Sequence, residues 1–377
     1  MKVPFLDLGA AHTELKDEID EALLRVASSG WYVGGPEVSR FEDEFAAYCG
    51  SDYCVGVGNG LDALHLALLA LQVGPGDEVI VSSNSYIATL LAVSMTGATP
   101  VLVEPDPATY NLDPDAIEAA LSPQSKVILP THLYGQPADI DPMLDIARRH
   151  GLKVLEDAAQ AHGARYKGRR VGAHGDAVAW SFYPSKNLGA MGDAGALTTN
   201  DPEIASRVRT LGNYGSARRY VNEVRGVNSR LDPLQAAVLS VKLRHLDDWN
   251  GRRAKLASRY SDALRNSPVK PPYVLNWAEP AWHLYVIDTP DRNAAERILA
   301  DAGVQTLVHY PIPPHHQQAY ADAAFSDDKL PIAEGLADRV LSVPIGPHVS
   351  SEQADIVVAT LRTLAKSGSS GNGTTGS

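Results

Sequence analysis

The sequence predicts an α/β fold built on a mostly parallel sheet with helices on both faces. From about residue 55 onward, short strands alternate with helices, and the strands are apolar almost throughout. Turn-forming residues such as Gly74-Pro75-Gly76-Asp77 separate these elements. Polar residues follow the ends of two strands, at Asp157 and at Lys186. Because ligands of parallel sheets bind beyond the carboxyl ends of the strands, the same pattern predicts where the site lies.

The first 50 residues predict an N-terminal arm followed by two helices. Apolar residues with helical spacing run from Leu15 to Ala27. Gly34-Gly35-Pro36 ends this pattern, and a second amphipathic helix follows with Val38, Phe41 and Phe45 on its apolar face.

The region from residue 55 to 200 carries the alternation of strands and helices. Short apolar runs bounded by turns predict the strands, and longer runs with a period of 3.6 predict the helices. The expected strands are 55–57, 78–81, 100–103, 126–130, 153–156, 177–182 and 195–199, and the expected helices start at Gly60 or span 88–96 and 142–150.

The C-terminal part predicts a second, smaller α+β domain. A long helical stretch rich in Ala, Leu, Lys and Arg runs from Gln235 to Leu264. A strand at Leu284–Ile287 and helices near 293–302 and 351–365 follow. We therefore expect a large domain over 1–245, including the arm, and a small domain over 246–366. The Gly- and Ser-rich residues 367–377 predict a flexible tail.

Composition limits the classes of function. The 377 residues are 44% hydrophobic and 21% charged, with a formal net charge of −12, which argues against a general nucleic-acid binder. The N-terminus lacks the apolar run of a signal peptide, and the apolar stretch Leu64–Leu71 is too short to span a membrane. Two cysteines, Cys49 and Cys54, indicate a reducing compartment. These observations predict a cytoplasmic protein without membrane or nucleic-acid partners.

The segment Ser181–Gly189 is the strongest indication of chemistry. Lys186 follows an apolar strand, with the hydroxyl of Ser181 five residues before it. A lysine desolvated in a cleft can form a Schiff base. Asp157 ends another strand, and its neighbour Glu156 faces the opposite way, so both cannot serve one site. A lysine for an aldehyde, an acid for a ring nitrogen and a hydroxyl for a phosphate suggest pyridoxal 5′-phosphate. The alternatives are a surface lysine and a helix-capping aspartate.

The turn Gly56–Leu61 is a second candidate for phosphate binding. It fails the G-x-G-x-x-G pattern because Leu61 stands in the third glycine position. A tight turn that leads into a helix still offers free backbone amides to an anion, although a purely structural turn has the same pattern. Tyr86 follows a strand and can stack on a flat cofactor or pack in the core.

Histidines and arginines further along the chain are candidates for substrate contacts. His309–His316 is rich in histidine, but metal binding needs at least three ligands and the prolines make wrapping awkward, so we expect a polar lid or substrate contact and no metal. Arg218 and Arg219 stand out in an acidic chain and suit a phosphorylated small molecule. A solvated surface loop is the alternative for both arginines.

These motifs resemble the DegT/DnrJ/EryC1/StrS family of PLP-dependent nucleotide-sugar aminotransferases. The resemblance runs from Phe5-Leu6-Asp7 to Pro344-Ile345-Gly346-Pro347. It implies the aspartate aminotransferase type I fold, with a mostly parallel mixed sheet of seven strands, and a homodimer with shared active sites. The motifs that carry it are Trp31–Val38, Gly58–Gly60, Glu156–Gly163, Ser181–Leu188 and Asn228–Asp232.

The resemblance also implies a role for each site residue. Lys186 would hold the cofactor and move protons, and Asp157 would contact its ring nitrogen. The phosphate would lie against Ser181 and the amides of Gly60 and Leu61. The remaining cofactor contacts would be Gln160 at the ring hydroxyl, Tyr86 against the ring, and Asn228 reaching the phosphate from the partner subunit.

Three further segments look most like enzymes that aminate C3 of dTDP-3-oxo-6-deoxyhexoses, with L-glutamate as donor, in antibiotic deoxyamino-sugar pathways. They are His132–Asp139, Gly192–Ala196 and Trp249–Arg253. The substrate side would involve Tyr183, Arg218, Arg219, Tyr220, His309 and Tyr310. The alternatives are a C4 aminotransferase of a dTDP-4-keto-6-deoxyhexose, a PLP-dependent sugar dehydratase, which retention of Lys186 disfavours, and a sugar-sensing regulatory protein without turnover.

Overall fold

The computed structural model describes residues 2–367 of the chain. A seven-stranded sheet forms its centre, in the order β1-β9-β8-β5-β4-β2-β3. Strands β2, β3, β4, β5 and β8 run parallel, and β9 is antiparallel to both β1 and β8. The predicted mostly parallel mixed sheet is therefore confirmed. The strands are β1 (Tyr53–Val57), β2 (Glu78–Ser82), β3 (Thr99–Val103), β4 (Ser125–Leu129), β5 (Lys153–Asp157), β8 (Ala177–Ser181) and β9 (Gly195–Thr199).

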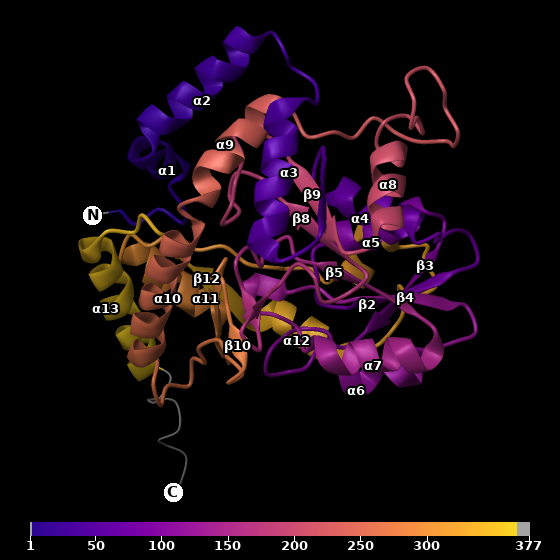
Figure 1. The fold of residues 1–377 in the computed structure, drawn as a ribbon. Coiled ribbons are helices and arrows are strands. Elements are labelled where there is room, and N and C mark those ends of the chain that lie inside the picture. The colour runs from indigo at the N-terminus through magenta and orange to yellow at the C-terminus, as the bar shows by residue number, and fades with distance from the viewer. Residues whose placement is uncertain (1, 368–377) are drawn as a thin grey trace, which may run out of the picture.

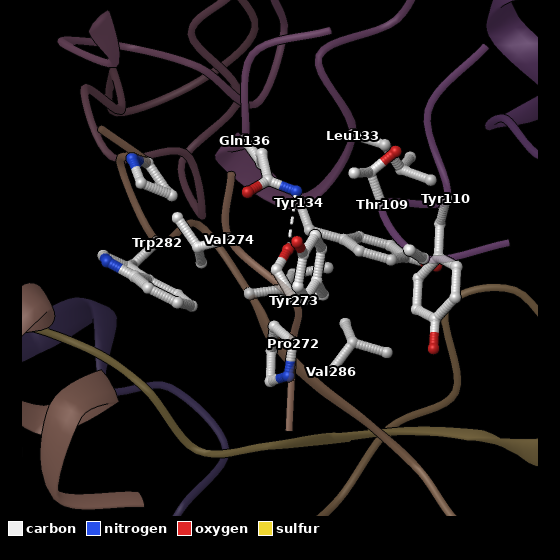
Figure 2. A pocket seen from close by; sticks show the side chains of 13 residues that line it. Thr109, Tyr110, Leu133, Tyr134, Gln136, Pro272, Tyr273, Val274, Trp282 and Val286 are labelled. Carbon is white, nitrogen blue, oxygen red and sulfur yellow. Dashed lines mark hydrogen bonds between the residues drawn. The ribbon is translucent and has the colours of Figure 1, made fainter. Parts of the chain in front are cut away.

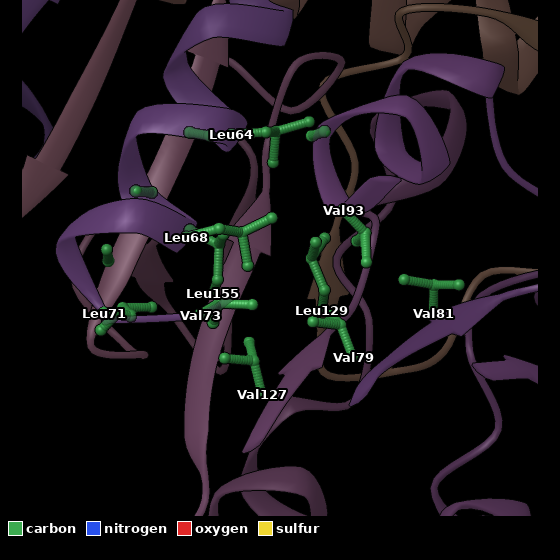
Figure 3. Packing of buried hydrophobic residues seen from close by; sticks show 14 of the residues in the cluster. Leu64, Leu68, Leu71, Val73, Val79, Val81, Val93, Val127, Leu129 and Leu155 are labelled. Atoms are coloured by element: carbon green, nitrogen blue, oxygen red, sulfur yellow. The ribbon is translucent and has the colours of Figure 1, made fainter. Parts of the chain in front are cut away.

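Both faces of the sheet are buried, which explains why the strands are apolar throughout. In β2, Val79 and Val81 point into one hydrophobic cluster, and Ile80 points into another on the opposite face. Figure 3 shows Val79 and Val81 packed with Leu64, Leu68 and Val93, which come from two covering helices. Those helices are α4 (Gly60–Ala70) and α5 (Ile87–Met95), and α7 (Ile140–His150) packs on the opposite face.

The N-terminal helices extend the fold beyond the sheet. They are α1 (Leu8–Glu14), α2 (Lys16–Ser29) and α3 (Pro36–Cys49), and α3 begins where Gly34-Gly35-Pro36 was expected to break the chain. Helix α2 packs against α9 (Pro233–Leu243), away from the sheet (Figure 1). The arm before α1 runs elsewhere, because Val3 pairs with Val304 and lies in the C-terminal hydrophobic cluster.

The predicted helical stretch 235–264 is divided into two helices, α9 and α10 (Leu246–Ala263). The amide of His245 bonds to the carbonyl of Lys242 at 3.0 Å, a tighter turn than the α-helical one. The break lets Leu246 and Trp249 reach two different hydrophobic clusters. No glycine or proline marks this position in the sequence, so the pattern gave no sign of it.

The C-terminal region has a separate hydrophobic core. Strands β11 (Tyr285–Asp288) and β12 (Val340–Val343) form an antiparallel pair, and α10, α11 (Arg292–Asp301) and α13 (Ser351–Ser367) pack around it (Figure 1). Helix α12 (Pro331–Arg339) and β12 were not predicted.

The predicted boundary at 245/246 falls at the break between α9 and α10 and stays a prediction. Apart from Ser367, the predicted flexible tail lies outside the described residues.

Shorter elements complete the chain, namely α6 (Pro114–Ile117), β6 (Arg165–Tyr166), β7 (Arg169–Arg170), α8 (Pro202–Leu211) and β10 (Ala278–Glu279). Of the helices in residues 2–367, none combines the length and apolar character that crossing a bilayer requires.

Candidate active site

The carboxyl ends of β5 and β8 bring the predicted residues together. Asp157 is the last residue of β5 and pairs with Ala179 of β8, which ends at Ser181. The first residue of α4 lies against that end, since a β-carbon added to Gly60 would be 2.6 Å from Cβ of Ser181. The first amides of a helix have no intrahelical acceptor, so those of Gly60 and Leu61 are free to bind an anion beside the Ser181 hydroxyl.

Asp157 is a buried carboxylate with two hydrogen bonds. Its Oδ2 accepts from the Thr89 hydroxyl at 2.9 Å, and its Oδ1 accepts from the Ala159 amide at 3.1 Å. A turn follows Asp157, so it does not cap a helix. Burial raises the pKa of Asp157, while these bonds and the Lys186 charge oppose the shift. A cation next to this carboxylate, such as a protonated ring nitrogen, would compensate its desolvation.

The Glu156 side chain lies on the opposite face of the strand from Asp157, as the alternation of side chains along a strand predicts. Its carboxylate accepts from Nε2 of His132 at 2.9 Å and from the Gly175 amide at 2.7 Å. Nδ1 of His132 accepts from the Ala138 amide at 2.9 Å, so the ring carries its proton on Nε2. These bonds hold the pKa of Glu156 below its usual value despite complete burial. The pair supports the strand end from the face opposite Asp157.

Lys186 lies half-buried in the loop after β8, and burial lowers the pKa of its amine to about 8, with Asp157 opposing the shift. Asn187, the next residue, is the centre of a buried hydrogen-bond network that was not predicted. The Asn187 amide group donates to the Ala281 carbonyl at 2.6 Å and to Oδ1 of Asn250 at 2.8 Å, and its Oδ1 lies 3.2 Å from Nδ1 of His283. These bonds tie the lysine loop to α10 and to the C-terminal region.

Three histidines surround the amine and stay neutral. Burial lowers the pKa of His162 to about 3 and that of His309 to about 4, and the Lys186 charge adds to both shifts. The same causes hold the pKa of His283 well below its usual value. Lys186 is therefore the titratable cation of this group near neutral pH.

Tyrosines and Gln160 form the opposite wall. Gln160 donates to the Tyr310 hydroxyl at 3.0 Å and accepts from the Tyr134 amide at 2.6 Å, so its side chain is fixed. The rings of Tyr310 and Tyr86 lie 5.4 Å apart, and Tyr86 is 55% exposed, so it is not a core residue. His309 bonds to Ser342 at 2.8 Å, and its carbonyl accepts from the Tyr134 hydroxyl. Tyr183 is exposed at the start of the lysine loop.

A small cavity lies behind this wall, between Tyr134 and the chain segment Pro272–Val274 (Figure 2). Its volume of about 30 Å³ has room for little more than a water molecule. The Gln136 side chain closes part of it by donating to the Tyr273 carbonyl at 3.0 Å. A cavity of this volume is too small to hold a nucleotide sugar.

The other predicted contacts lie on the excursion between α8 and α9, which leaves the body of the chain (Figure 1). Tyr220 is 86% exposed, with the Arg219 guanidinium over its ring at 5.0 Å, and Arg218 is also exposed. None of these three contacts Lys186 within the described chain. Asn228 is exposed too, but its neighbour Ser229 accepts from the Gly58 amide at 2.9 Å. Asn228 thus lies near the start of α4.

The histidine-rich segment brings one acid close. His315, His316 and Glu334 of α12 have ligand atoms within 4.8 Å of one another, and Nε2 of His315 lies 3.5 Å from Oε1 of Glu334. This contact joins the segment to α12. The expectation of no metal stays a prediction.

Comparison with known proteins identifies the family. The model of the DegT/DnrJ/EryC1/StrS aminotransferase family matches residues 13–362. The chain belongs to this family. It is therefore an aminotransferase that uses pyridoxal phosphate, and the resemblance read from the motifs is confirmed.

Relatives within the family are similar over nearly the whole chain. A transaminase of Streptomyces venezuelae, named for dTDP-3-amino-3,4,6-trideoxy-α-D-glucose, is 53% identical over 97% of each chain. The erythromycin biosynthesis sensory transduction protein EryC1 of Saccharopolyspora erythraea is 58% identical, over 96% of this chain and 99% of that protein. The solved structure of S. venezuelae DesV, in complex with a ketimine intermediate, has a TM-score of 0.95 at 52% identity, over 97% of this chain and 99% of the other. The fold is confirmed, and the chain is a sugar aminotransferase.

The residues present fit the cofactor. A half-buried amine with a lowered pKa, a buried carboxylate and a cradle of free amides beside a hydroxyl suit its aldehyde, its ring nitrogen and its phosphate. The cradle is narrow because Gly60 has no side chain.

Gly60→Ala is expected to weaken pyridoxal phosphate binding about tenfold or more and to lower the free energy of unfolding by about 1–3 kcal/mol, because Ser181 must shift to admit the methyl group. A titration of the cofactor-free protein and a urea melt measure the two effects. Gly74→Ala is the matched control, since its β-carbon would meet nothing within 4 Å. Equal behaviour of the two variants would contradict a tight phosphate cradle.

Proposed function

We propose that this aminotransferase transfers the amino group of L-glutamate to C3 of a dTDP-3-oxo-6-deoxyhexose, in the biosynthesis of a deoxyamino sugar for an antibiotic. Two relatives at 53% and 51% identity are named as transaminases of dTDP-3-amino sugars, the second from Aneurinibacillus thermoaerophilus. The observation that carries the proposal in the structure is the half-buried Lys186 amine next to the buried Asp157 carboxylate.

Each residue has a definite task in both half-reactions. Bound pyridoxal phosphate supplies an electron sink and a carrier for the amino group. Nζ of Lys186 takes the proton from Cα of the donor and delivers it on the cofactor side, and it reverses these steps for the sugar. Asp157 would keep a positive charge on the ring nitrogen of the bound cofactor, and Gln160, fixed by Tyr310 and Tyr134, would orient its ring hydroxyl. Lys186 is half-buried, which limits the access of water to its amine.

The test supplies L-glutamate with the 3-oxo and the 4-oxo dTDP sugars separately. NMR of the products locates the new nitrogen. We expect an amine at C3 only; an amine at C4 would replace the proposal by its alternative, and a deoxygenated product would indicate a dehydratase. The yellow protein should also bleach on addition of glutamate alone.

A regulatory role is a second candidate because of the names of two relatives. EryC1 is called a sensory transduction protein, and a relative of Geobacillus stearothermophilus at 44% identity is called a pleiotropic regulatory protein. The present chain nevertheless retains Lys186, Asp157 and the Gly60 cradle together. Bleaching by glutamate without any sugar product would favour the sensing role.

We further propose a homodimer with shared active sites, in which the excursion of one subunit completes the site of the other. Two observations support it. Arg218, Arg219 and Tyr220 are exposed and do not contact Lys186 within residues 2–367 of their own chain, and Val221 and Val224 beside them are apolar and exposed. Paired guanidinium groups suit the diphosphate of a nucleotide sugar.

The double variant Arg218→Ala/Arg219→Ala is expected to raise the KM for the dTDP sugar about tenfold or more and to leave the glutamate half-reaction unchanged, because glutamate carries no diphosphate. Steady-state kinetics with each substrate measure the difference. Mixing this variant with Lys186→Ala subunits should restore part of the activity, because one site of each mixed dimer is then intact. An unchanged sugar KM would refute the arginine assignment, and failure to complement would refute sharing.

A further inference from the structure

An open groove of about 430 Å³ lies beside the lysine loop. Its walls are formed by the N-terminal segment Leu6–His12, the loop Pro184–Met191, which contains Lys186, and the helices α9 and α10. Pro347 and His348 also line it. A volume of this order is sufficient for a small organic ligand. Neither the cofactor cradle at Gly60 nor the ring wall at Tyr310 and Gln160 lines it.

Two buried cations line this groove without an acid to balance them. Lys242 is 8% exposed, and its amine donates to the Gly189 carbonyl at 2.6 Å. Arg253 is 4% exposed and donates to the carbonyls of Trp282, His283 and Ile345, while its Nε has no partner. Within residues 2–367, no carboxylate forms an ion pair with either side chain. A buried cation without a counter-charge is costly, so the groove favours an anion.

The acids near the groove are engaged elsewhere. Oδ1 of Asp7 accepts from the amides of Gly9 and Ala10 at the start of α1. Glu14 pairs with Arg252 at 2.8 Å and with His348 at 2.6 Å. With Lys186 added, three cations face the groove against the single carboxylate of Asp7. The electrostatic balance of the groove is therefore positive.

The geometry points to this groove as the site for a carboxylate of the amino donor, with Lys242 as its direct contact. The assignment rests on the proposed function, which requires a dicarboxylic amino acid to reach Lys186. Lys242 bonds to the loop that contains Lys186, so a donor held there lies along the same wall as the reacting amine. A carboxylate can accept hydrogen bonds from an ammonium group and from backbone amides at the same time. It therefore suits a wall made of the Lys242 side chain and the backbone of the lysine loop.

The test measures binding of glutarate, a dicarboxylate that has no amino or oxo group and does not react. Calorimetric titration of the holoenzyme compares wild type, Lys242→Met and Lys242→Arg. We expect the dissociation constant to rise at least tenfold in Lys242→Met and to stay within threefold in Lys242→Arg. Lys255→Met, at an exposed position on the following helix α10, is the matched control and should leave binding unchanged.

A crystal structure of the wild-type holoenzyme with glutarate keeps the test decisive if Lys242→Met does not fold. A carboxylate within about 3.2 Å of Nζ of Lys242 supports the assignment, and glutarate bound elsewhere or equal binding by all variants overturns it. Tight binding of inorganic phosphate at the same place, without discrimination in favour of glutarate, also overturns it, since the groove would then be a general anion site. Glutarate binding needs no turnover, so an enzyme that binds it at Lys242 but aminates no sugar would refute only the proposed function.

Discussion

Lys186→Met is expected to lower the rate of amino transfer by about 10³-fold or more, because no other side chain in the described site offers an amine at the same position. The variant should also lose the visible absorbance of the lysine-bound cofactor. Single-turnover absorbance with glutamate measures the loss directly. Retention of full turnover would refute the assignment of Lys186, whatever the similarity to known transaminases.

Lys186→Met is also expected to raise the free energy of unfolding of the cofactor-free protein. The direction of this change follows from the lowered pKa of the Lys186 amine. The pKa of Lys186 falls from an ordinary 10.5 to about 8 on folding, so the unfolded chain holds its proton more tightly. Below pH 8 this difference costs the native state about 3 kcal/mol. Methionine has similar length and no charge, so Lys186→Met removes the cost.

Urea melts of the cofactor-free proteins at pH 7 and above pH 10 check this expectation. The stability advantage of Lys186→Met should be present at pH 7 and should vanish as the pH rises from 8 through 10.5, because the wild-type amine then loses its proton in both states. Lys255→Met, at an exposed position, should show no such pH dependence. A variant less stable than wild type at pH 7 would show that the lysine is not desolvated.

Residues at strand ends were predictable because parallel topology gathers them. Asp157 and Ser181 end neighbouring strands, so the apolar pattern and the turns were enough to place them at one edge of the sheet. The position of Gly60 beside Ser181 was expected only from the family resemblance. The opposite orientation of Glu156 followed from the two-residue period of a strand. These are local rules, and each was correct.

Contacts between distant segments were not predictable from such rules. Asn187 is joined to Asn250, 63 residues away, and to Ala281, 94 residues away, and no local pattern marks either partner. The division of α9 from α10 has the same origin, since burial of Leu246 and Trp249 in different clusters overrides helix propensity. Lys242 looked like one of many helical lysines until the fold buried it.

Local strand geometry and contacts between distant segments position different residues of the candidate site. The strand ends fix Asp157 and the proposed phosphate cradle, whereas the distant contacts of Asn187 fix the loop that carries Lys186. The acid and the amine thus have different hydrogen-bond partners, and each charge shifts the pKa of the other group. Removing one charge should therefore shift the titration of the other without moving its loop.

Asp157→Asn tests that expectation and has the second largest effect. The change keeps the shape and an acceptor for the Thr89 hydroxyl but removes the charge, so we expect turnover to fall by about 10²–10⁴-fold because the ring nitrogen is no longer kept protonated. The Asp157 charge raises the pKa of Lys186, so in the cofactor-free variant the pKa of this amine should fall below about 8. The pH dependence of its acylation rate measures the shift.

Stability should change in the opposite sense to activity. Burial raises the pKa of Asp157 above its ordinary 3.8, so wild type loses stability as the pH rises from that value through the folded-state pKa, and Asp157→Asn does not. The cofactor-free variant should thus be more stable than wild type at neutral pH and equal to it near pH 3. Thr89→Val, which retains the carboxylate but removes its hydroxyl donor, should raise the pKa of Asp157 further and lower turnover by a smaller factor. Wild-type turnover in Asp157→Asn would mean that the carboxylate does not act on the cofactor ring.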